Sequence, residues 1–600
     1  GDCMNHDSKS QYTVDTFRKA AENLLSGIAS CSHLSVARER LVSKIGRMLS
    51  DAFRTQPGLD PQLLVRSRDC ADTLLGVLHE RSDIMSGFSV AQALWDVARN
   101  IPRDDLQEGF FAEMTHWILG LQGQALIPYM VEASVSAELS GRDAAIARSN
   151  ELDKMWRHVE DRMSRYADGL NDEVIANRTE NRRRICSVMA ASEQEWNDWQ
   201  WQTSHLITDA QNLGSIVELS PQEQAGIEGA CKAHLPFGIT PYYASLMDRV
   251  SDGRDRAIRA QVIPPLNYVS RMEQCRGGKD GSCDFMLESD TSPVDRITRR
   301  YPAIVILKPF NTCPQICVYC QRNWEIDQAM APDALADEAT IDSAIDWLKH
   351  HPSVREVLVT GGDPMAMTDE QLGRLFEKLA GVDHVDMIRL GTRTPVTLPM
   401  RFTPAAARMI GSFRKTGRRD IAIVTHVEHP YEITPEMAAA VDLLKRQGLS
   451  IYNQQVYTFY VSRRFETAKL RVLLRRIGIQ PYYTFVPKGK EETANYRVPI
   501  ARILQEAKEE ARLLPGSRRT DEPVYNVPGL GKNYLRAAQH RAILSLLGDG
   551  SRIYEFHPWE KNIAPRHMHT AADVPILEYL RRLEQLGEQS EEYQSIWYYF

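Results

Sequence analysis

From residue 301 onward, short β-rich apolar runs alternate with amphipathic helical stretches. Six runs predict strands, at 304–308, 356–360, 387–391, 421–425, 450–457 and 481–486. Apolar residues at helical spacing fill most of the intervals, as at 341–350, 369–379 and 435–446. A repeated strand-then-helix order requires parallel strands joined by right-handed crossovers. The sequence therefore predicts an α/β fold with about six units in a partial, TIM-like (β/α) barrel, whose reactive residues follow the strands.

Residues 1–190 have a different pattern, in which one helical stretch succeeds another. Val14, Phe17, Ala21 and Leu24, for example, fall at helical spacing. Pro and Gly are sparse, no run predicts a strand, and no chemical motif is present. We therefore expect an all-helical N-terminal extension that serves packing or assembly.

The chain has 600 residues and a formal net charge of −7. This length predicts more than one domain. This mildly acidic net charge does not indicate a basic surface that would bind nucleic acid or an anionic membrane. No apolar run is long enough to span a bilayer, and the start lacks a signal-peptide pattern. We expect a cytoplasmic protein that binds neither nucleic acid nor membrane.

Three of the ten cysteines, Cys313, Cys317 and Cys320, lie within eight residues directly after the first predicted strand. Three thiolates on one tight loop can hold three irons of a 4Fe–4S cube. The fourth iron can then be chelated by a small molecule with an amine and a carboxylate, and S-adenosylmethionine (SAM) has both. A zinc site is the alternative, although structural zinc normally takes four protein ligands and no cysteine follows Cys320. The spacing resembles that of the radical SAM superfamily.

Gly361, Gly362 and Asp363 end the second predicted strand. Glycines let the backbone approach a ligand closely. In the radical SAM superfamily the corresponding segment contacts the amino group of SAM, whereas an isolated Gly-Gly-Asp is more often a turn.

Many ordered segments between residues 193 and 560 resemble the lysine 2,3-aminomutase family. They include 196–202, 239–246, 292–294, 300–302, 391–395, 425–434 and 453–454. Family members use a 4Fe–4S cluster, SAM and pyridoxal 5′-phosphate (PLP) on a partial barrel. The resemblance implies an isomerase that moves the α-amino group of a free amino acid to its β-carbon. It also implies an electron donor such as flavodoxin or ferredoxin, and a homo-oligomer, which we expect to be a dimer.

The same resemblance assigns the PLP and SAM residues. Lys532, in a glycine-rich segment, matches the lysine that forms the Schiff base with PLP. Arg300, followed by Tyr301, aligns with a contact to the PLP phosphate. A second family arginine is replaced by Ile304, for which Lys308 is a candidate substitute. The family positions near SAM correspond to His426 and Gln454, although strand-end packing also explains these two residues.

Arg322 matches the arginine that holds the substrate α-carboxylate, while another family arginine is replaced by Val318. Two aspartates that bind the ε-ammonium in lysine-specific members correspond to Lys488 and Asn526. A cation and an amide would repel an ammonium and favour a side-chain carboxylate. This pattern resembles glutamate 2,3-aminomutase. Aspartate, glutamine and lysine stay open as substrates, and Lys488 could instead point to solvent.

The expected domains are a helical extension over 1–190, a helical segment with the PLP-phosphate contact over 191–300, the barrel with the PLP site over 301–560, and a helical tail over 561–600. A PLP-free radical SAM enzyme that modifies a peptide is a competing hypothesis. So is a regulatory protein that has kept the fold.

Overall fold

The computed structural model describes residues 11–55, 60–126, 135–277, 283–284, 286–487, 491–557 and 568–600. In its nine-stranded main sheet, the spatial order of the strands follows the sequence. Short antiparallel strands lie at the edges, β1 (Ile297–Thr298) and β9 (Gly531–Tyr534). The parallel strands between them are β2 (Ile304–Leu307), β3 (Glu356–Val359), β4 (Met387–Gly391), β5 (Asp420–Thr425), β6 (Ser450–Val456), β7 (Gln480–Phe485) and β8 (Glu522–Val527).

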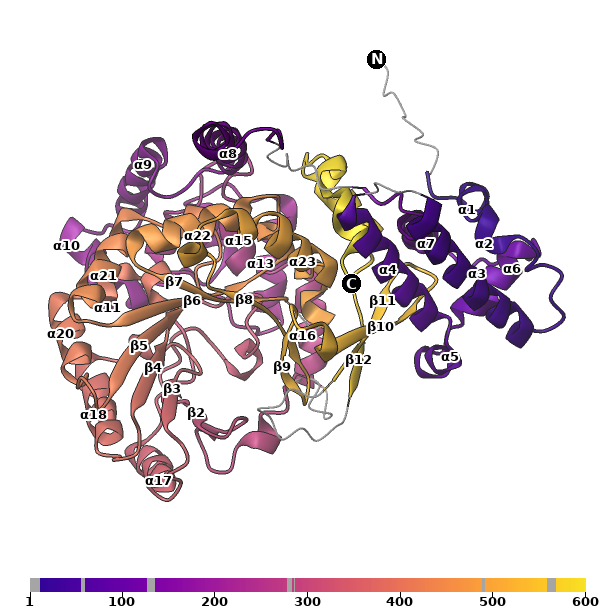
Figure 1. Cartoon of the computed structure of the whole chain (residues 1–600). Helices are drawn as coiled ribbons and strands as arrows, with labels where there is room; N and C mark the ends of the chain where they lie inside the picture. Colours follow the sequence, from indigo (N-terminus) through magenta and orange to yellow (C-terminus); the bar gives the residue numbers. More distant parts are fainter. Residues whose placement is uncertain are drawn as a thin grey trace, which may run out of the picture.

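The sheet curls into an open barrel (Figure 1), which confirms the predicted fold class. The six predicted strands correspond to β2 through β7, each within one residue at either end. The parallel strand β8 was not predicted. It contains Pro523 and Asn526, residues that usually indicate a loop and are depleted in strands.

Helices cover the outer face of the barrel (Figure 1). Four of them begin after a side-chain cap, at Asp337, Thr368, Thr403 and Thr434, which satisfies a backbone N–H of the first turn. Each of the four buries an apolar stripe toward the sheet. The helices between residues 338 and 510 are α17 (Glu338–Lys349), α18 (Asp369–Ala380), α19 (Thr394–Thr397), α20 (Pro404–Ser412), α21 (Pro435–Arg446), α22 (Glu466–Ile477) and α23 (Ile500–Glu509).

The segment that precedes β1 is helical and packs into the same core as the barrel. Trp196, Ile227 and Tyr243, for example, are buried in one cluster with Val357 and Ile423 of the sheet. Its helices are α10 (Glu193–Trp196), α11 (Trp199–Ser204), α12 (Ala210–Gly214), α13 (Pro221–Lys232), α14 (Pro241–Ala244), α15 (Arg256–Val262) and α16 (Leu266–Gly277).

A second hydrophobic core joins the two ends of the chain. It contains Phe110 and Trp117 from the N-terminal helices with Tyr554 and Trp597 from the C-terminal part. The N-terminal helices are α1 (Val14–Ala20), α2 (Glu22–Leu25), α3 (Leu34–Thr55), α4 (Pro61–Val77), α5 (Glu80–Ser86), α6 (Val90–Ala98) and α7 (Glu108–Leu121). The C-terminal elements are β10 (Arg541–Leu546), β11 (Arg552–Phe556), β12 (His569–Ala572), α24 (Ile576–Gln585) and the 3-10 helix η11 (Ser590–Tyr598).

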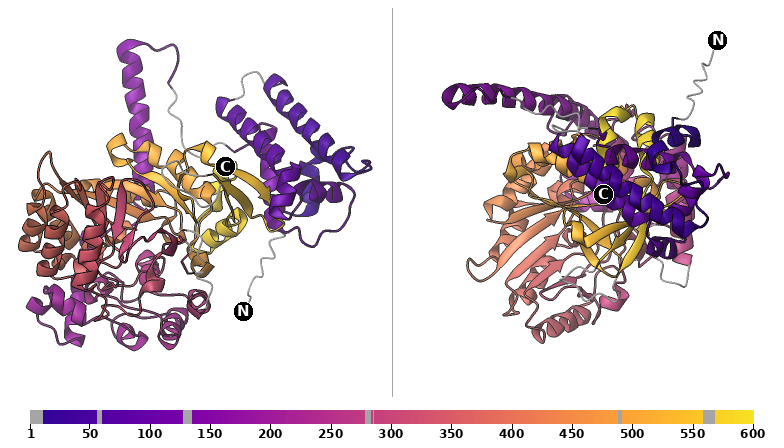
Figure 2. Two further views of the ribbon diagram at one scale, coloured as in Figure 1. Left: turned by 90° about the horizontal axis from the view of Figure 1, so that it is seen from below. Right: turned by 45° about the vertical axis from the view of Figure 1, so that its right-hand side comes forward.

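The packing divides the expected helical extension into two parts. Helices α8 (Gly141–Met163) and α9 (Asp172–Val188) lie beside the barrel, away from α1–α7 (Figure 2). Val159 packs with Phe465, and Ile185 belongs to the barrel core. The expected helical tail is also only partly helical, because β12 pairs with β11 across the boundary at residue 561.

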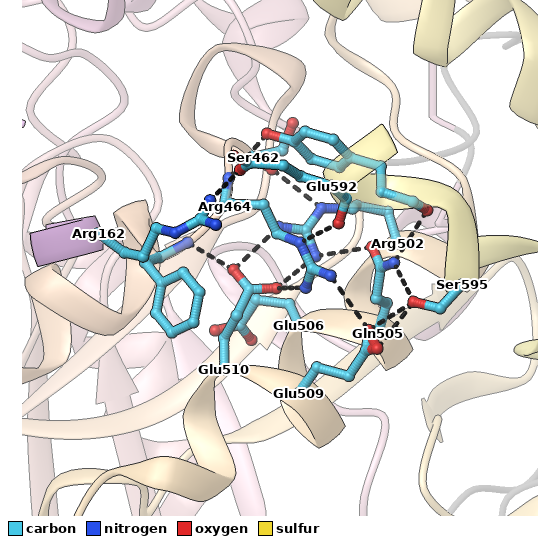
Figure 3. Close-up of polar contacts among 12 residues, drawn as sticks. Arg162, Ser462, Arg464, Arg502, Gln505, Glu506, Glu509, Glu510, Glu592 and Ser595 are labelled. Atoms are coloured by element: carbon cyan, nitrogen blue, oxygen red, sulfur yellow. Dashed lines mark hydrogen bonds and ion pairs between the residues drawn. The ribbon is translucent and has the colours of Figure 1, made fainter. Parts of the chain in front are cut away.

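A buried polar network ties α23 to the C-terminal segment (Figure 3). Arg464 and Arg502 donate to the Glu510 carboxylate at 2.8 and 2.7 Å, and the Gln505 amide donates to the Ser595 hydroxyl at 2.9 Å. Each of these charges is buried with a partner, which is the condition under which a buried charge is tolerated.

None of the described helices combines the length and apolar character needed to cross a bilayer.

Candidate active site

Successive β-strands deliver the predicted SAM-side residues to one edge of the sheet. The cysteine loop follows β2, the Gly-Gly-Asp segment follows β3, and His426 follows β5. Parallel strands place their carboxyl ends at the same edge, so the positions expected from sequence come together there.

The Gly-Gly segment lies directly against the cysteine loop. The Gly362 N–H donates to the Phe310 carbonyl at 3.0 Å, and the Asp363 N–H donates to the Thr312 carbonyl at 2.9 Å. A Cβ at Gly362 would lie 2.2 Å from the Thr312 carbonyl oxygen, and Gly361 has φ +116°. Both positions therefore require glycine, the first because of close approach and the second because of its backbone conformation.

The Asp363 carboxylate accepts four hydrogen bonds within the protein. One oxygen accepts from the Met365 N–H at 3.0 Å and the Thr392 hydroxyl at 2.6 Å. The other accepts from the Arg393 N–H at 3.0 Å and the Thr394 hydroxyl at 2.9 Å. Asp363 thus ties the end of β3 to the end of β4, beside the two glycines.

Arg393 connects the cysteine loop to a buried polar group. Its Nη1 donates to Cys317 Sγ at 3.3 Å and also to the Tyr319 hydroxyl. Its Nη2 pairs with Glu432, which accepts a hydrogen bond from the Tyr243 hydroxyl at 2.7 Å. From the sequence, Arg393 was indicated only as part of the family segment 391–395. Its position at the end of β4 was the available signal for a site residue.

In the part of the chain that the structure describes, none of the three cysteines forms a disulfide, and burial raises the pKa of Cys317 to about 11. Metal binding must therefore displace protons from them. Among the described side chains, no three His, Cys, Asp or Glu converge on a single metal ion. An iron–sulfur cube differs from such a site because each thiolate binds a different iron, so the ligands are spaced more widely.

His426, directly after β5, and Gln454, in the neighbouring strand β6, are in contact through a hydrogen bond to the Gln454 backbone. Burial, with the nearby Arg393 charge, lowers the pKa of His426 to about 4, so its imidazole is neutral near pH 7. A neutral imidazole provides one donor and one acceptor. Such a group can bond to the polar groups of a nucleoside.

Lys532 lies in the hairpin formed by β8 and β9, directly opposite Asn526. Directly paired residues of an antiparallel ladder point to the same face. The Lys532 Nζ lies 5.1 Å from the centre of the Tyr301 ring and 5.6 Å from that of Tyr483. The structure therefore brings together the predicted lysine, its predicted neighbour Tyr301 and the predicted pocket residue Asn526.

The Lys532 ammonium is destabilised by its surroundings. Burial is the main cause, followed by the positive charges of Arg389, Arg300 and Arg322, and together they lower its pKa to about 8. An unshifted lysine is almost entirely protonated near pH 7. A lysine with this pKa offers a much larger fraction of the neutral amine, which is the nucleophilic form.

Three cations converge on the buried Glu288 carboxylate. Arg322 contacts Oε1 through Nε and Nη2, both at 2.7 Å. Arg300 Nη2 also contacts Oε1 at 3.2 Å, and Lys308 Nζ contacts Oε2 at 3.2 Å. These contacts lower the pKa of Glu288 to about 2 against the opposing effect of burial. Sequence reasoning missed Glu288, since nothing in its local pattern indicates a site.

The Arg300 side chain fits a phosphate partner. Its Nε is buried and has no hydrogen-bond partner among the described residues. A buried donor without a partner is costly, and a phosphate oxygen would satisfy it. The Lys308 side chain lies against Gly361, where a Cβ would meet it at 3.0 Å, so the cation cluster borders the SAM segment.

Two replaced family arginines have different surroundings. Val318 is buried in an apolar cluster with Tyr268 and Tyr496, where a guanidinium would lack a charged partner in that cluster. Ile304 is a half-buried residue of β2. Lys488 lies outside the described residues.

The chain is similar to several known proteins. Residues 307–456 match the model described as the Radical SAM superfamily, a range that contains the cysteine loop and Gln454. An uncharacterized KamA family protein of Methanocaldococcus jannaschii is 43% identical over 550 residues, or 88% of each chain. The L-lysine 2,3-aminomutase of Acetoanaerobium sticklandii is 34% identical over 315 residues, 52% of this chain and 72% of the relative. The glutamate 2,3-aminomutase of Clostridioides difficile is 31% identical over 334 residues, 55% of this chain and 74% of the relative.

Proposed function

Because the chain belongs to the KamA family of radical SAM proteins, we propose that it is an amino acid 2,3-aminomutase whose preferred substrate is glutamate. Relatives named as amino acid 2,3-aminomutases are isomerases. The proposed reaction moves the α-amino group to the β-carbon and leaves the composition of the amino acid unchanged.

The cofactors of this activity are a 4Fe–4S cluster, SAM and PLP. The cluster and SAM supply a radical that can abstract a hydrogen atom, and PLP supplies a π-bond that can carry the migrating nitrogen. The protein must hold and orient these groups, because the cofactors supply the difficult chemistry. The residues proposed to hold them are Cys313, Cys317 and Cys320 for the cluster, Gly361, Gly362, His426 and Gln454 for SAM, and Lys532, Arg300 and Tyr301 for PLP.

Arg322 and Lys532 have the properties that their proposed roles require. Glu288 contacts Nε and Nη2 of Arg322. Within the described residues, no hydrogen bond engages Nη1 of this arginine. The Nη1 side can therefore receive the substrate α-carboxylate in a fixed orientation. The depressed pKa of Lys532 supports its proposed role as the amine that binds PLP.

The neutral Asn526, which lies opposite Lys532, is the observation that carries the choice of glutamate. Arg300 and Arg322 are proposed to bind the PLP phosphate and the α-carboxylate, so they do not distinguish glutamate from lysine. The resemblance implies an aspartate at the position of Asn526 in lysine-specific members, where it binds the substrate ε-ammonium, and an amide cannot replace that charge. A side-chain carboxylate could instead accept a hydrogen bond from the Asn526 amide. Lys488, the second proposed partner, lies outside the described residues.

An anaerobic assay with SAM, dithionite and PLP tests the proposal, with glutamate, aspartate, glutamine and lysine offered separately. We expect β-glutamate as the main product. An Asn526→Asp variant is the matched test of pocket charge, and we expect it to turn over glutamate more slowly. Formation of β-lysine without β-glutamate would contradict the proposed substrate, although it would leave the aminomutase activity intact.

The activity requires an electron donor, and we propose flavodoxin or ferredoxin for this role. A cytoplasmic location is part of the proposal, because a reducing environment keeps the three cluster cysteines available as thiolates. We also propose that the protein works as a homodimer, which sedimentation of the reconstituted protein would test.

A further inference from the structure

Glu288 makes its contacts from a fixed backbone position. It directly precedes a short 3-10 turn, and its N–H donates to the Asp284 carboxylate at 2.8 Å. Its carbonyl accepts the Ser292 hydroxyl at 2.8 Å. The carboxylate is thus presented from an anchored turn to groups that come from the loops after β1 and β2.

The contacts of Glu288 occupy different nitrogens of Arg322 and Arg300, and they leave different donors available on the two guanidinium groups. Glu288 Oε1 occupies the Nε and Nη2 edge of Arg322, which leaves the Nη1 side for another acceptor. The same oxygen contacts only Nη2 of Arg300, whose buried Nε has no partner among the described residues. One carboxylate therefore fixes two guanidinium groups and leaves each with an unused donor.

We propose that Glu288 is a positioning residue that assigns Arg322 to the substrate α-carboxylate and Arg300 to the PLP phosphate. This inference rests on the proposed function, because it presumes those two anions. Without Glu288, two arginines and Lys308 would share the site with no fixed orientation, and either anion could pair with either arginine. Supporting groups that hold a ligand-binding residue are generally required for correct geometry.

The position of Glu288 favours catalysis by orienting the two arginines, whereas its negative charge weakens the binding of anions to them. A carboxylate among three cations weakens the attraction of the site for any anion. Its removal should therefore leave anion binding as tight or make it tighter, while the reacting groups lose their alignment. A residue with a merely structural role would instead lower stability, cofactor binding and turnover together.

Glu288→Gln is the decisive variant, since it keeps the side-chain shape and removes the charge. We expect kcat to fall about 100-fold, the cost typical of a misplaced reacting group. We expect neither the KM for glutamate nor the Kd for PLP to rise. Inorganic sulfate should compete with PLP at an about tenfold lower concentration than in the wild type. The PLP and sulfate titrations follow the absorbance of lysine-bound PLP in protein without substrate.

Glu288→Asp keeps the charge but shortens the reach, so we expect wild-type sulfate sensitivity with reduced kcat. Glu325→Gln is the matched control, because the Glu325 carboxylate lies 3.8 Å from the same Lys308. Among the described residues, this carboxylate forms no hydrogen bond or ion pair with Arg300 or Arg322, and the substitution keeps the backbone N–H of residue 325 that donates to the Arg322 carbonyl at 3.0 Å. We expect its kcat to remain within about threefold of wild type, as for a weak, partly exposed pair.

Wild-type kcat and unchanged sulfate sensitivity in Glu288→Gln would overturn the inference. So would a joint loss of PLP binding and melting temperature. Failure of the proposed function has a different signature, since the wild-type protein would then isomerise none of the amino acids. The sulfate and PLP titrations do not depend on which amino acid is the substrate.

Discussion

The cysteine loop and the lysine hairpin differ in how the chain assembles them. All three thiols come from one loop after β2, and the adjoining strand ends hold that loop through Gly362 and Arg393. Lys532 comes from the far edge of the sheet and meets partners more than 200 residues away in sequence, such as Tyr301. The cysteine loop is therefore a local structure, whereas the PLP side depends on the approach of the two edges of the open barrel.

Loss of one cluster cysteine should abolish both the cleavage of SAM and the isomerisation of the amino acid. In Cys317→Ser we expect iron content after anaerobic reconstitution to fall, and both SAM cleavage and isomerisation to drop to background, because a cluster held by two thiolates is lost. Cys231→Ser is the control, since that cysteine is exposed and outside the loop. Wild-type cluster absorption in Cys317→Ser would contradict the ligand assignment.

Loss of Lys532 should abolish isomerisation but leave the cleavage of SAM. In Lys532→Ala we expect isomerisation to fall to background while reductive cleavage of SAM continues, because the amine that binds PLP is gone and the cysteine loop is intact. Lys532→Arg retains the positive charge and should be equally inactive. Full turnover in either variant, without added amine, would defeat the assignment.

Arg322→Lys should weaken substrate binding with little effect on the cysteine loop. A lysine is a point charge and cannot reproduce the fork of the guanidinium. Hydrogen bonds to charged groups contribute roughly 1.5–3 kcal/mol, so we expect KM for glutamate to rise about 10- to 100-fold. Arg299→Lys is the control, because Arg299 contacts Pro302 and Ser353. An unchanged KM would place the α-carboxylate elsewhere.

The pKa of Lys532 predicts how PLP capture depends on pH. Only the neutral amine attacks, and its fraction rises about tenfold per pH unit below the pKa. Because burial lowers this pKa from 10.5 to about 8, the rate should rise up to about pH 8 and level off above it. Stopped-flow absorbance between pH 6 and 10 measures this. A rate still rising near pH 10 would mean that the lysine is unperturbed.

Arg393→Lys should produce the smallest change, a shift in cluster potential. Hydrogen bonds to cluster sulfurs help to set the potential, and the loss of the Nη1–Cys317 contact should lower it by some tens of millivolts. Potentiometric titration followed by electron paramagnetic resonance measures the shift. Arg401→Lys, a similarly buried arginine that contacts Met365 and Met367, should leave the potential unchanged.

The same contrast explains what could be predicted from the sequence. The β2–β7 strands and the cysteine loop have signals confined to short segments, so periodicity and spacing were sufficient. Lys532 and Arg300 could be proposed as PLP residues only through family resemblance. Glu288 and the saturated Asp363 were not foreseen, because their roles arise from contacts across different loops. The strand β8 was missed because Pro523 and Asn526 are poor strand formers whose tertiary packing overrides local preference.

The second core links the helical N-terminal region to the hairpin that carries Lys532. Val527 and Leu530, which flank the turn before Lys532, are buried in the same apolar cluster as Phe110 and Trp117. We therefore expect α7 to influence the hairpin that carries the lysine, whereas β2, the strand before the cysteine loop, belongs to the other core through Val305 and Leu307. The residence time of PLP is therefore expected to depend on helices that contain no chemical motif of their own.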